Sequence, residues 1–363
     1  MAIERIVTSA AALPDEEPVN WSLRPTRMGE YIGQADLVSR LSIALQAAKG
    51  RKSPLDHVLL HGPPGLGKTT LAHVIAAEMG TRAVTTSGPA LTKGTDLVAS
   101  LTRLEAGDIL FIDEIHRMPI AVEEFIYPAM EDFRIDVPVD AGTHARTVQI
   151  KLKPFTLIGA TTRAGLMSSP LRSRFVLSHH LKFYTVDELL TIAQRSAAML
   201  DIPTTDTAAL RIIAERSRGT PRIVNRLLRR VRDYCQVKAG GVLNCQTVVA
   251  ALGLEGVDAL GLDDLDRQYL RVLGTTYRGG PTGLEAIAAS MNEDSGTLED
   301  VVEPFLLQLG FVARTRRGRM LTYAAADYIG VPRPAEFADA ADVSAQQAGA
   351  GGPSGAEKPS SLF

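Results

Sequence analysis

The sequence has few cysteines, few aromatic residues and no long apolar run. Its 363 residues include two cysteines, and aromatic residues make up 5% of the chain. Cys235 and Cys245 lack the spacing of metal ligands, so we expect structural thiols in a reducing compartment rather than a disulfide. No run of about 18 apolar residues occurs and the N-terminus lacks a signal-peptide pattern, which predicts a soluble cytoplasmic protein.

A strong net charge is also lacking. The formal charge of −2 indicates no partner by itself. Arginine is nevertheless concentrated in 211–232 and 314–319, where local basic surfaces are possible. With about 150 residues per domain as a guide, the length predicts two or three domains.

A phosphate-binding loop is the feature around which the chain is organised. The apolar run 57–61 leads into Gly-Pro-Pro-Gly-Leu-Gly-Lys-Thr-Thr at 62–70, and 71–79 has the pattern of a helix. This is the G-x-x-x-x-G-K-[ST] motif in a strand, turn and helix context. Such a loop directs backbone N–H groups at phosphate oxygens beside a helix N-terminus. Lys68 should reach the β and γ phosphates and the Thr69 hydroxyl should bind Mg²⁺, so the sequence predicts a nucleoside triphosphate site.

Two acids end the next buried strand. The apolar residues 109–112 are followed by Asp113 and Glu114. Carboxyl ends of parallel strands meet at the edge where α/β sheets bind ligands. Solvated capping is the usual explanation of such a pair, but the upstream phosphate loop favours a Walker B site. Asp113 would then hold Mg²⁺, directly or through water, and Glu114 would polarise the attacking water.

Two later segments carry weaker indications of catalysis. An apolar strand over 154–160 ends in the hydroxyls of Thr161 and Thr162, which could orient water or sense the γ-phosphate. Arg172 and Arg174 follow at a helix start. An arginine can stabilise a transferring phosphoryl group from a neighbouring subunit, and a surface arginine pair is the alternative. Between these regions, 134–152 alternates in the manner of a hairpin, where exposed apolar residues would mark a partner surface.

Residues 183–255 predict a small helical domain. Thr185 and Glu188 form a capping box, and Asp206 is a candidate cap for a helix through Arg216. Thr220 and an N1 proline begin the next helix. Arg222 lies in its first turn, an unfavourable place for a cation unless an anion such as phosphate is near.

The region 260–330 predicts a nucleic-acid-binding domain. Helical patterns at 266–275, 284–291 and 297–309 precede two short strands, 311–313 and 320–323, which flank four arginines at 314–319. Three helices and a β-ribbon with a basic tip are typical of a winged helix. Its arginines could contact phosphates independently of sequence, and an ordinary solvated turn is the alternative.

These features resemble the RuvB Holliday-junction branch-migration ATPases of bacteria over about residues 20–332. The resemblance rests on a series of matching segments: Leu23-Arg24-Pro25, Tyr31-Ile32-Gly33-Gln34, Gly62 to Thr70, Thr86 to Pro89, Phe111 to Arg117, Tyr127 to Asp132, Gly159 to Gly165, Ser169 to Phe175, Gly219 to Arg230 and Arg317-Gly318-Arg319. The 113–116 and 159–165 segments are much more specific than the phosphate loop, which many unrelated ATPases share.

The resemblance implies an α/β P-loop AAA+ ATPase domain, followed by an all-α lid domain and a winged-helix domain. The expected parts are a flexible N-terminal arm (1–20), the large ATPase domain (21–182), the lid (183–255), the winged helix (256–332) and a disordered tail (333–363). Such proteins form a hexamer around duplex DNA and use ATP and Mg²⁺ to pull it. A RuvA-type junction-binding protein loads them, and a RuvC-type resolvase can join.

The resemblance also implies roles for individual residues. The catalytic set would be Lys68, Asp113, Glu114, Thr161 as sensor 1 and Arg174 as a finger acting on a neighbour's ATP. Mg²⁺ would be held by Thr69 and Asp113. Nucleotide contacts are expected from Leu23, Arg24, Gly65, Gly67, Lys68, Thr69, Thr70, Glu131, Asp132, Phe133, Arg172, Arg174, Tyr184 and Arg222. DNA would meet Arg314, Arg317 and Arg319, and the RuvA-type partner would meet Val148 and Ile150 of the hairpin.

Two other functions remain open at this stage. An ATP-gated loader or transcriptional regulator would share every ATP residue. A protein unfoldase would need a pore loop with an aromatic residue, whereas this chain carries a basic wing. Movement of a DNA junction distinguishes the translocase from the loader.

Overall fold

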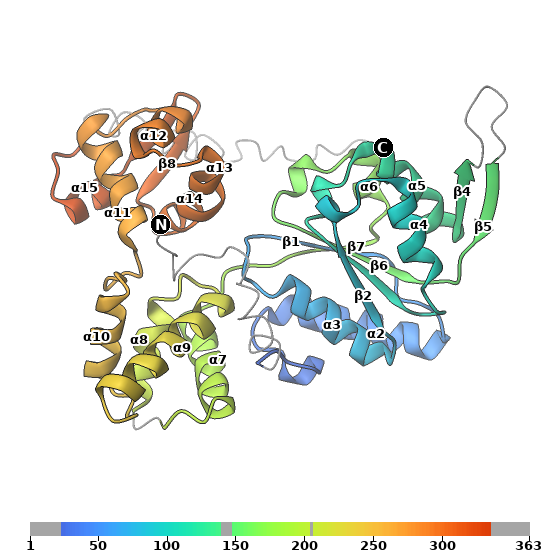
Figure 1. Ribbon diagram of the computed structural model, residues 1–363, viewed down its shortest axis with the longest axis horizontal. Coiled ribbons are helices and arrows are strands. Elements are labelled where there is room, and N and C mark those ends of the chain that lie inside the picture. The colour runs from blue at the N-terminus through green and yellow to red at the C-terminus, as the bar shows by residue number, and fades with distance from the viewer. Residues whose placement is uncertain (1–22, 139–146, 204–205, 335–363) are drawn as a thin grey trace, which may run out of the picture. The chain divides into compact units, whose positions relative to one another are not determined.

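The computed structural model describes residues 23–138, 147–203 and 206–334. The chain divides into two compact units, Met1–Gly261 and Leu262–Phe363 (Figure 1). The predicted N-terminal arm, most of the tail and the turn of the hairpin lie outside the described residues. Among the residues described, no helix is long and apolar enough to cross a membrane.

A five-stranded parallel sheet forms the centre of the first unit. Its order is β2 (Ala83–Ser87), β3 (Ile109–Asp113), β6 (Thr156–Thr161), β1 (Val58–His61) and β7 (Leu177–His180). All carboxyl ends lie at one edge because the strands are parallel. The phosphate loop follows β1, Asp113 ends β3 with Glu114 directly after it, and Thr161 ends β6, the strand between β3 and β1.

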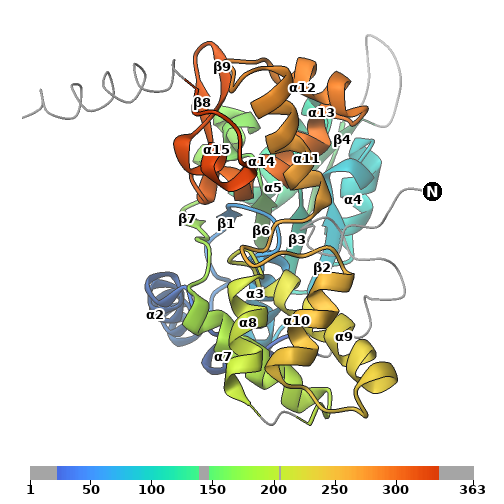
Figure 2. The same ribbon diagram turned by 90° about the vertical axis from the view of Figure 1, so that its left-hand side faces the viewer.

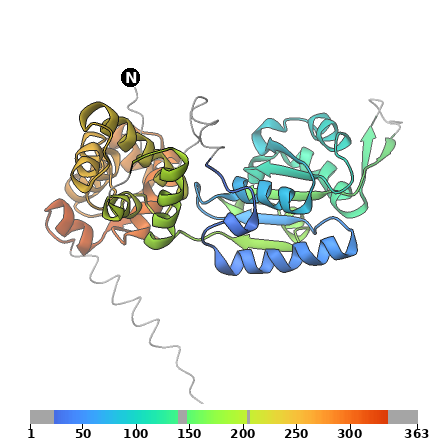
Figure 3. The ribbon, with the colours of Figure 1, turned by 90° about the horizontal axis from the view of Figure 1, so that it is seen from below.

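The strands place alternate side chains on opposite faces of the sheet, and each face has its own core. Val58 and Leu60 belong to one cluster and Leu59 to the other, as a two-residue period requires. Helices α2 (Ala35–Arg51) and α3 (Lys68–Met79) pack on the first face. Helices α4 (Gly94–Thr102) and α5 (Ile120–Asp132) pack on the second (Figure 3). Burial on both faces explains why the central strands β3, β6 and β1 are nearly continuous apolar runs, whereas the edge strands β2 and β7 carry hydroxyl and histidine side chains.

Shorter elements complete the large domain. The hairpin pairs β4 (Arg134–Pro138) with β5 (Thr147–Lys151). Helix α6 (Ser169–Ser173) is capped by Ser168, whose Oγ accepts from the N–H of Leu171. Short 3₁₀ turns lie at Met28–Glu30, Gly88–Ala90, Ile115–Arg117 and Ala164–Leu166.

Four helices follow the sheet within the same unit: α7 (Val186–Met199), α8 (Thr207–Glu215), α9 (Pro221–Lys238) and α10 (Cys245–Leu254) (Figure 2). The capping box of Thr185 and Glu188 is confirmed, as is the Asp206 cap of α8. The core of these helices is continuous with the cluster under α2 and α3. This segment is the predicted lid.

The second unit contains helices and a small ribbon. The helices are α11 (Asp264–Arg271), α12 (Leu284–Met291), α13 (Ser295–Thr297), α14 (Glu303–Gln308) and α15 (Tyr323–Ile329), and the antiparallel ribbon is β8 (Val312–Thr315) with β9 (Gly318–Leu321). A π-helical turn, Leu298–Val302, joins α13 to α14. Thr282 bridges to Arg319 beside the ribbon. The unit therefore has the predicted three-helix and wing arrangement, with α15 added after the wing.

Three local predictions were wrong. Helix α3 begins at Lys68 rather than Leu71, because Gly67 takes a left-handed conformation and lets the helix start directly at the loop. The Thr220 hydroxyl makes no cap contact with α9 and donates instead to the carbonyl of Ser217. Tyr323 begins α15 rather than ending a strand, since Thr322 caps that helix. The predicted domain boundaries stay predictions.

Asp108 anchors the start of β3, the strand that delivers the acid pair. Its carboxylate accepts from the backbone N–H of Arg82 at 3.1 Å and of Glu105 at 2.9 Å, and from the Arg82 guanidinium at 3.0 Å. Burial raises the pKa of Asp108, but these hydrogen bonds outweigh it and hold the pKa below its ordinary value of 3.8.

We therefore predict that Asp108→Asn lowers the free energy of unfolding at pH 7 by about 1–2 kcal/mol, because charge-assisted hydrogen bonds are lost. A carboxylate with a lowered folded-state pKa stabilises the fold above its unfolded pKa and loses this contribution as pH falls through the folded value. The difference from the wild type should thus persist down to about pH 4 and shrink below it. Urea unfolding of both proteins at pH 7 and pH 3 measures this, and an equal difference at both pH values would contradict it.

Candidate nucleotide site and nucleic-acid interface

The phosphate loop holds a buried lysine in place. Lys68 is the first residue of α3 and is 7% exposed. Its Nζ donates to the carbonyls of Gly62 at 2.8 Å and Pro63 at 2.9 Å. Burial lowers the pKa of Lys68 to about 8, and the nearby carboxylates of Asp113 and Glu114 oppose that shift. A buried cation that is surrounded by a glycine-rich turn is suited to bind phosphate oxygens.

The acid pair of β3 meets the loop as predicted. The Thr69 hydroxyl lies 3.5 Å from Asp113 Oδ2, so a hydroxyl and a carboxylate converge at the strand edge. Oxygen donors of this kind are the ligands that Mg²⁺ prefers. Glu114 has a φ of +46°, an uncommon value for a residue with a side chain. Strained backbone of this kind is found at functional sites.

Glu114 is held by two residues that sequence reasoning did not assign to it. The Thr162 hydroxyl donates to Glu114 Oε2 at 3.2 Å, and His116 Nδ1 lies 3.2 Å from the same oxygen. Thr161, the predicted sensor, is buried within β6, and its Oγ1 lies 2.9 Å from His116 Nδ1. Thr161 ends β6 and Thr162 follows it, and both hydroxyls reach the Glu114 and His116 pair at the strand edge. The sensor role of Thr161 stays a prediction.

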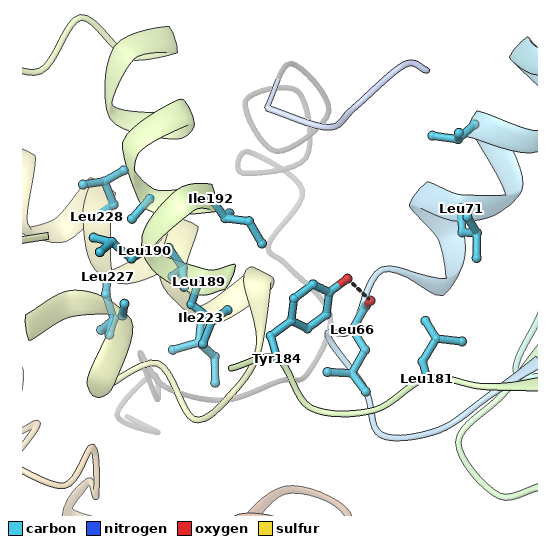
Figure 4. Packing of buried hydrophobic residues seen from close by; sticks show 14 of the residues in the cluster. Leu66, Leu71, Leu181, Tyr184, Leu189, Leu190, Ile192, Ile223, Leu227 and Leu228 are labelled. Carbon is cyan, nitrogen blue, oxygen red and sulfur yellow. Dashed lines mark hydrogen bonds between the residues drawn. The ribbon is translucent and has the colours of Figure 1, made fainter. Parts of the chain in front are cut away.

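The lid reaches the phosphate loop through a tyrosine. Tyr184 is 6% exposed, and its hydroxyl donates to the carbonyl of Leu66 at 3.2 Å (Figure 4). The hydroxyl also lies 3.2 Å from that of Tyr31, whose pKa is raised to about 12 by burial. Gly33 has a φ of +78°, and a Cβ there would lie 2.6 Å from the Tyr184 ring. Tyr184, a predicted nucleotide contact, is thus packed directly against the phosphate loop.

Arg222 approaches the same loop from the lid. Its backbone N–H donates to the carbonyl of Gly65 at 3.5 Å. Burial lowers the pKa of the Arg222 guanidinium, while the charges of Asp113 and Glu114 raise it. The structure therefore brings the predicted sensor 2 arginine together with the Walker B acids.

The segment that carries Leu23 is fastened to the lid by a residue the sequence did not single out. Leu23 is 2% exposed. Arg195 of α7 donates through its two Nη atoms to the carbonyls of Leu23 at 2.7 Å and Glu30 at 2.9 Å. Gln34 adds a pair of hydrogen bonds to the backbone of Lys182. Arg195 is one of many arginines in the lid, so nothing in the local pattern could have identified it.

Arg174 lies in a second cluster, against α5. Its guanidinium contacts Glu131 Oε1 at 3.1 Å and the carbonyl of Pro170 at 2.8 Å, and it lies 4.3 Å from the centre of the Tyr127 ring. Together with Glu131 and Phe133 it lines a cavity of about 440 Å³ beside the start of β1 and β7. The predicted finger Arg174 and the predicted nucleotide contacts Glu131 and Phe133 are thereby brought together.

The wing of the second unit carries the predicted DNA arginines. Arg314 and Arg319 lie opposite each other on β8 and β9, and Arg317 is exposed at the tip. Both strand arginines contact Glu303 of α14, a residue that sequence reasoning missed. Burial raises the pKa of Glu303, but hydrogen bonds from Arg319, Tyr269 and Arg314 outweigh it and lower the pKa. Glu303 is therefore a buried carboxylate anion.

The β4–β5 hairpin, which is predicted to bind the partner protein, is the remaining predicted interface. Val148 is 49% exposed on β5 and lies opposite Val137, whereas Ile150 is partly buried opposite the buried Ile135. An exposed valine at this position leaves apolar surface available to a partner.

A parallel sheet with a phosphate loop, an acid pair at a neighbouring strand end and a helical lid on the loop defines a P-loop ATPase of the AAA+ class. Three family models match consecutive parts of the chain: the Holliday junction DNA helicase RuvB P-loop domain over residues 23–181, the RuvB AAA lid domain over 184–258 and the RuvB C-terminal winged helix domain over 259–330. The chain belongs to the RuvB family.

Relatives of known name agree over nearly the whole chain. The Holliday junction branch migration complex subunit RuvB of Kosmotoga olearia is 55% identical over 318 residues, covering 88% of this chain and 93% of the relative. The subunit of the same name from Desulfosudis oleivorans is 56% identical over 311 residues, covering 86% and 90%. A solved structure, the Thermotoga maritima RuvB Holliday junction branch migration motor, matches with a TM-score of 0.79 and 50% identity, covering 86% of this chain and 100% of that one.

We predict that Thr162→Val lowers kcat for ATP hydrolysis about 10-fold or more, since a well-placed general base is worth about 10²–10⁴-fold and Glu114 loses a donor that orients it. ATP affinity should change less than about two-fold, because the phosphate loop is intact. Steady-state hydrolysis and fluorescent-nucleotide titration measure the two quantities. Thr161→Val is the comparison variant and tests the predicted sensor, because the Thr161 hydroxyl contacts His116 rather than Glu114. A larger kcat loss in Thr161→Val than in Thr162→Val would place the sensor at Thr161.

Proposed function

We propose that this chain is the ATP-driven motor of Holliday-junction branch migration, which pulls duplex DNA through a ring of six copies. The observation that carries the proposal is the combination of an ATP site shared by sheet edge and lid with a basic wing on an adjoining winged helix. DNA recombination and repair are the processes that such a motor serves. Its expected partners are the junction arms, a RuvA-type protein at the hairpin and, at resolution, a RuvC-type resolvase.

The ATP chemistry follows from the residues at the sheet edge. Lys68 and the loop N–H groups would bind the phosphates, and Glu114 would take a proton from the attacking water. Thr69 and Asp113 have the donor atoms to hold Mg²⁺, which supplies charge stabilisation to the phosphates. Thr162 would orient Glu114. Leu23 would enclose the nucleotide from the segment 23–34, which we call the strap, and Tyr184 and Arg222 would enclose it from the lid.

Arg174 supports a ring in which each site is completed by a neighbour. Its contacts are with α5 and α6, and the cavity it lines lies beside the amino ends of β1 and β7, while the phosphate loop lies at their carboxyl ends. A finger placed away from its own phosphate loop can act on the ATP of the adjacent copy. Glu131, Asp132 and Phe133 would contact the same neighbouring nucleotide. Hydrolysis would then depend on assembly.

Arg222 couples the phosphates to the lid. When phosphate leaves, the guanidinium loses its anion and the lid loses a contact with the loop. A rigid-body shift of the lid is a means of moving the domain that follows it in sequence. Wing contacts to phosphates alone suit a motor that must pass over any sequence. Exposed Val148 supports binding of the RuvA-type partner at the hairpin.

The test is movement of a synthetic four-way junction with homologous arms, in the presence of a RuvA-type protein and Mg²⁺-ATP. We expect the wild type to move the junction, and Glu114→Gln and Arg174→Ala to bind ATP without moving it. Loss of the base should cost about 10²-fold or more in hydrolysis, and loss of the finger about 10³-fold or more.

Mixing the two variants tests where the finger acts. Glu114→Gln subunits keep the finger and Arg174→Ala subunits keep the base, so mixed rings should regain part of the hydrolysis rate. Failure to regain any activity would contradict a finger acting in trans. A wild type that hydrolyses ATP on DNA but leaves the junction in place would instead indicate a loader.

A further inference from the structure

A buried carboxylate lies beneath the two strand arginines of the wing. Glu303 opens α14, and its side chain is 0% exposed. Such a charge is costly in a core unless it is paired and hydrogen-bonded. Its partners come from three directions: α11, β8 and β9.

The two arginines bind this carboxylate by the same edge of the guanidinium. Arg314 donates from Nε to Glu303 Oε2 at 2.8 Å and contacts the same oxygen through Nη2. Arg319 donates from Nε to Oε1 at 2.9 Å and from Nη2 to Oε2 at 3.4 Å. The Tyr269 hydroxyl donates to Oε1 at 2.8 Å. Both side chains therefore turn their Nε and Nη2 edge inward and their Nη1 edge away from the carboxylate.

The side-chain exposures agree with this arrangement, in which the carboxylate lies inside and the arginines lie outside it. The Arg314 side chain is 42% exposed and that of Arg319 is 20% exposed, above a carboxylate with no exposure. A guanidinium has five donors in a fixed plane, so one edge can be anchored while the other serves a phosphate. Each guanidinium therefore keeps its Nη1 edge off Glu303, and the charge of Glu299 also acts on Arg319.

The register of the ribbon explains why an anion is needed there. Arg314 and Arg319 are direct cross-strand partners. Like charges in this position repel one another, and long side chains lose much rotamer freedom when a phosphate orders them. Glu303 offsets the repulsion and orders both side chains before DNA arrives.

We propose that Glu303 is a positioning residue for DNA: it holds the Arg314 and Arg319 guanidinium groups side by side so that their outward edges meet the DNA backbone together. The inference rests on the proposed function, because it assumes that the wing binds DNA. For the effect of Glu303→Gln on DNA affinity, the inference predicts the opposite sign from an argument based on net charge alone. Removing a negative charge from a DNA-binding domain should tighten binding by simple electrostatics, whereas loss of positioning should weaken it.

The experiment measures binding of the full chain to a labelled duplex by fluorescence anisotropy, with a slowly hydrolysed ATP analogue, between 50 and 200 mM KCl. Each phosphate contact adds about 0.9 to the slope of log affinity against log salt. For Glu303→Gln we expect about five- to tenfold weaker binding and a slope reduced by roughly one to two. Tyr269→Phe is the matched control, since it removes one donor to Glu303 and keeps the carboxylate and both arginines. Its slope should equal that of the wild type, whatever its melting temperature.

Two further variants make the result decisive. Glu303→Asp keeps the charge but shortens the side chain by one methylene, so it should also reduce the slope, and it decides the matter if Glu303→Gln fails to fold in thermal melting. The double variant Arg314→Ala, Arg319→Ala tests the wing itself. If that double variant binds DNA as tightly as the wild type, the wing part of the proposed function fails. If the double variant binds weakly while folded Glu303→Gln and Glu303→Asp keep the wild-type slope, the positioning inference alone is overturned.

Discussion

The hydrogen bond from the Tyr184 hydroxyl to the carbonyl of Leu66 is the contact on which the nucleotide site depends. It joins Tyr184, in the segment between β7 and α7, to the phosphate loop. The closeness of Gly33 leaves no room for a side chain beside this ring. Because loop and lid meet here, a ligand that changes the loop also acts on the lid. We therefore expect ATP binding to change the position of the lid, and the position of the lid to change ATP binding.

The parts of the reaction centre are present, but they are held by other partners. Glu114 contacts Thr162 and His116, Lys68 contacts loop carbonyls, and Arg174 contacts Glu131. On the proposed function, the Lys68 contacts would give way to phosphate and the Arg174 contact to a neighbouring subunit, while Thr162 would keep Glu114 oriented. On that proposal, hydrolysis would depend on nucleotide and on assembly together, which suits a motor that should not consume ATP alone.

In the second unit, Glu303 and its arginines are likewise charged side chains that are paired within the fold before any ligand binds. A charge that would be costly by itself is paired within the fold, and its partners keep donors for an external anion. Glu303 arranges the wing arginines in this way, as the lid arranges the phosphate loop. Both sites gain from side chains ordered before the ligand arrives.

The sequence predicted the sheet edge well because its motifs are local. The phosphate loop, Asp113, Glu114 and the caps Thr185 and Asp206 depend on residues within a few positions of one another. Contacts across the fold could not be predicted in this way. Arg195 binds the carbonyl of Leu23 across 172 positions. Glu303, Thr162 and the failed Thr220 cap likewise depend on tertiary neighbours, which no periodicity encodes.

Hydrogen–deuterium exchange with and without a slowly hydrolysed ATP analogue and Mg²⁺ tests the shared site most directly. If loop, strap and lid form one nucleotide site, the analogue should protect 62–70 and also 23–34, the start of α7 and the first turn of α9. Exchange in α10, which lies beyond these contacts, should stay unchanged. Protection confined to 62–70 would show that ATP binds the loop without engaging the lid, and would contradict the account.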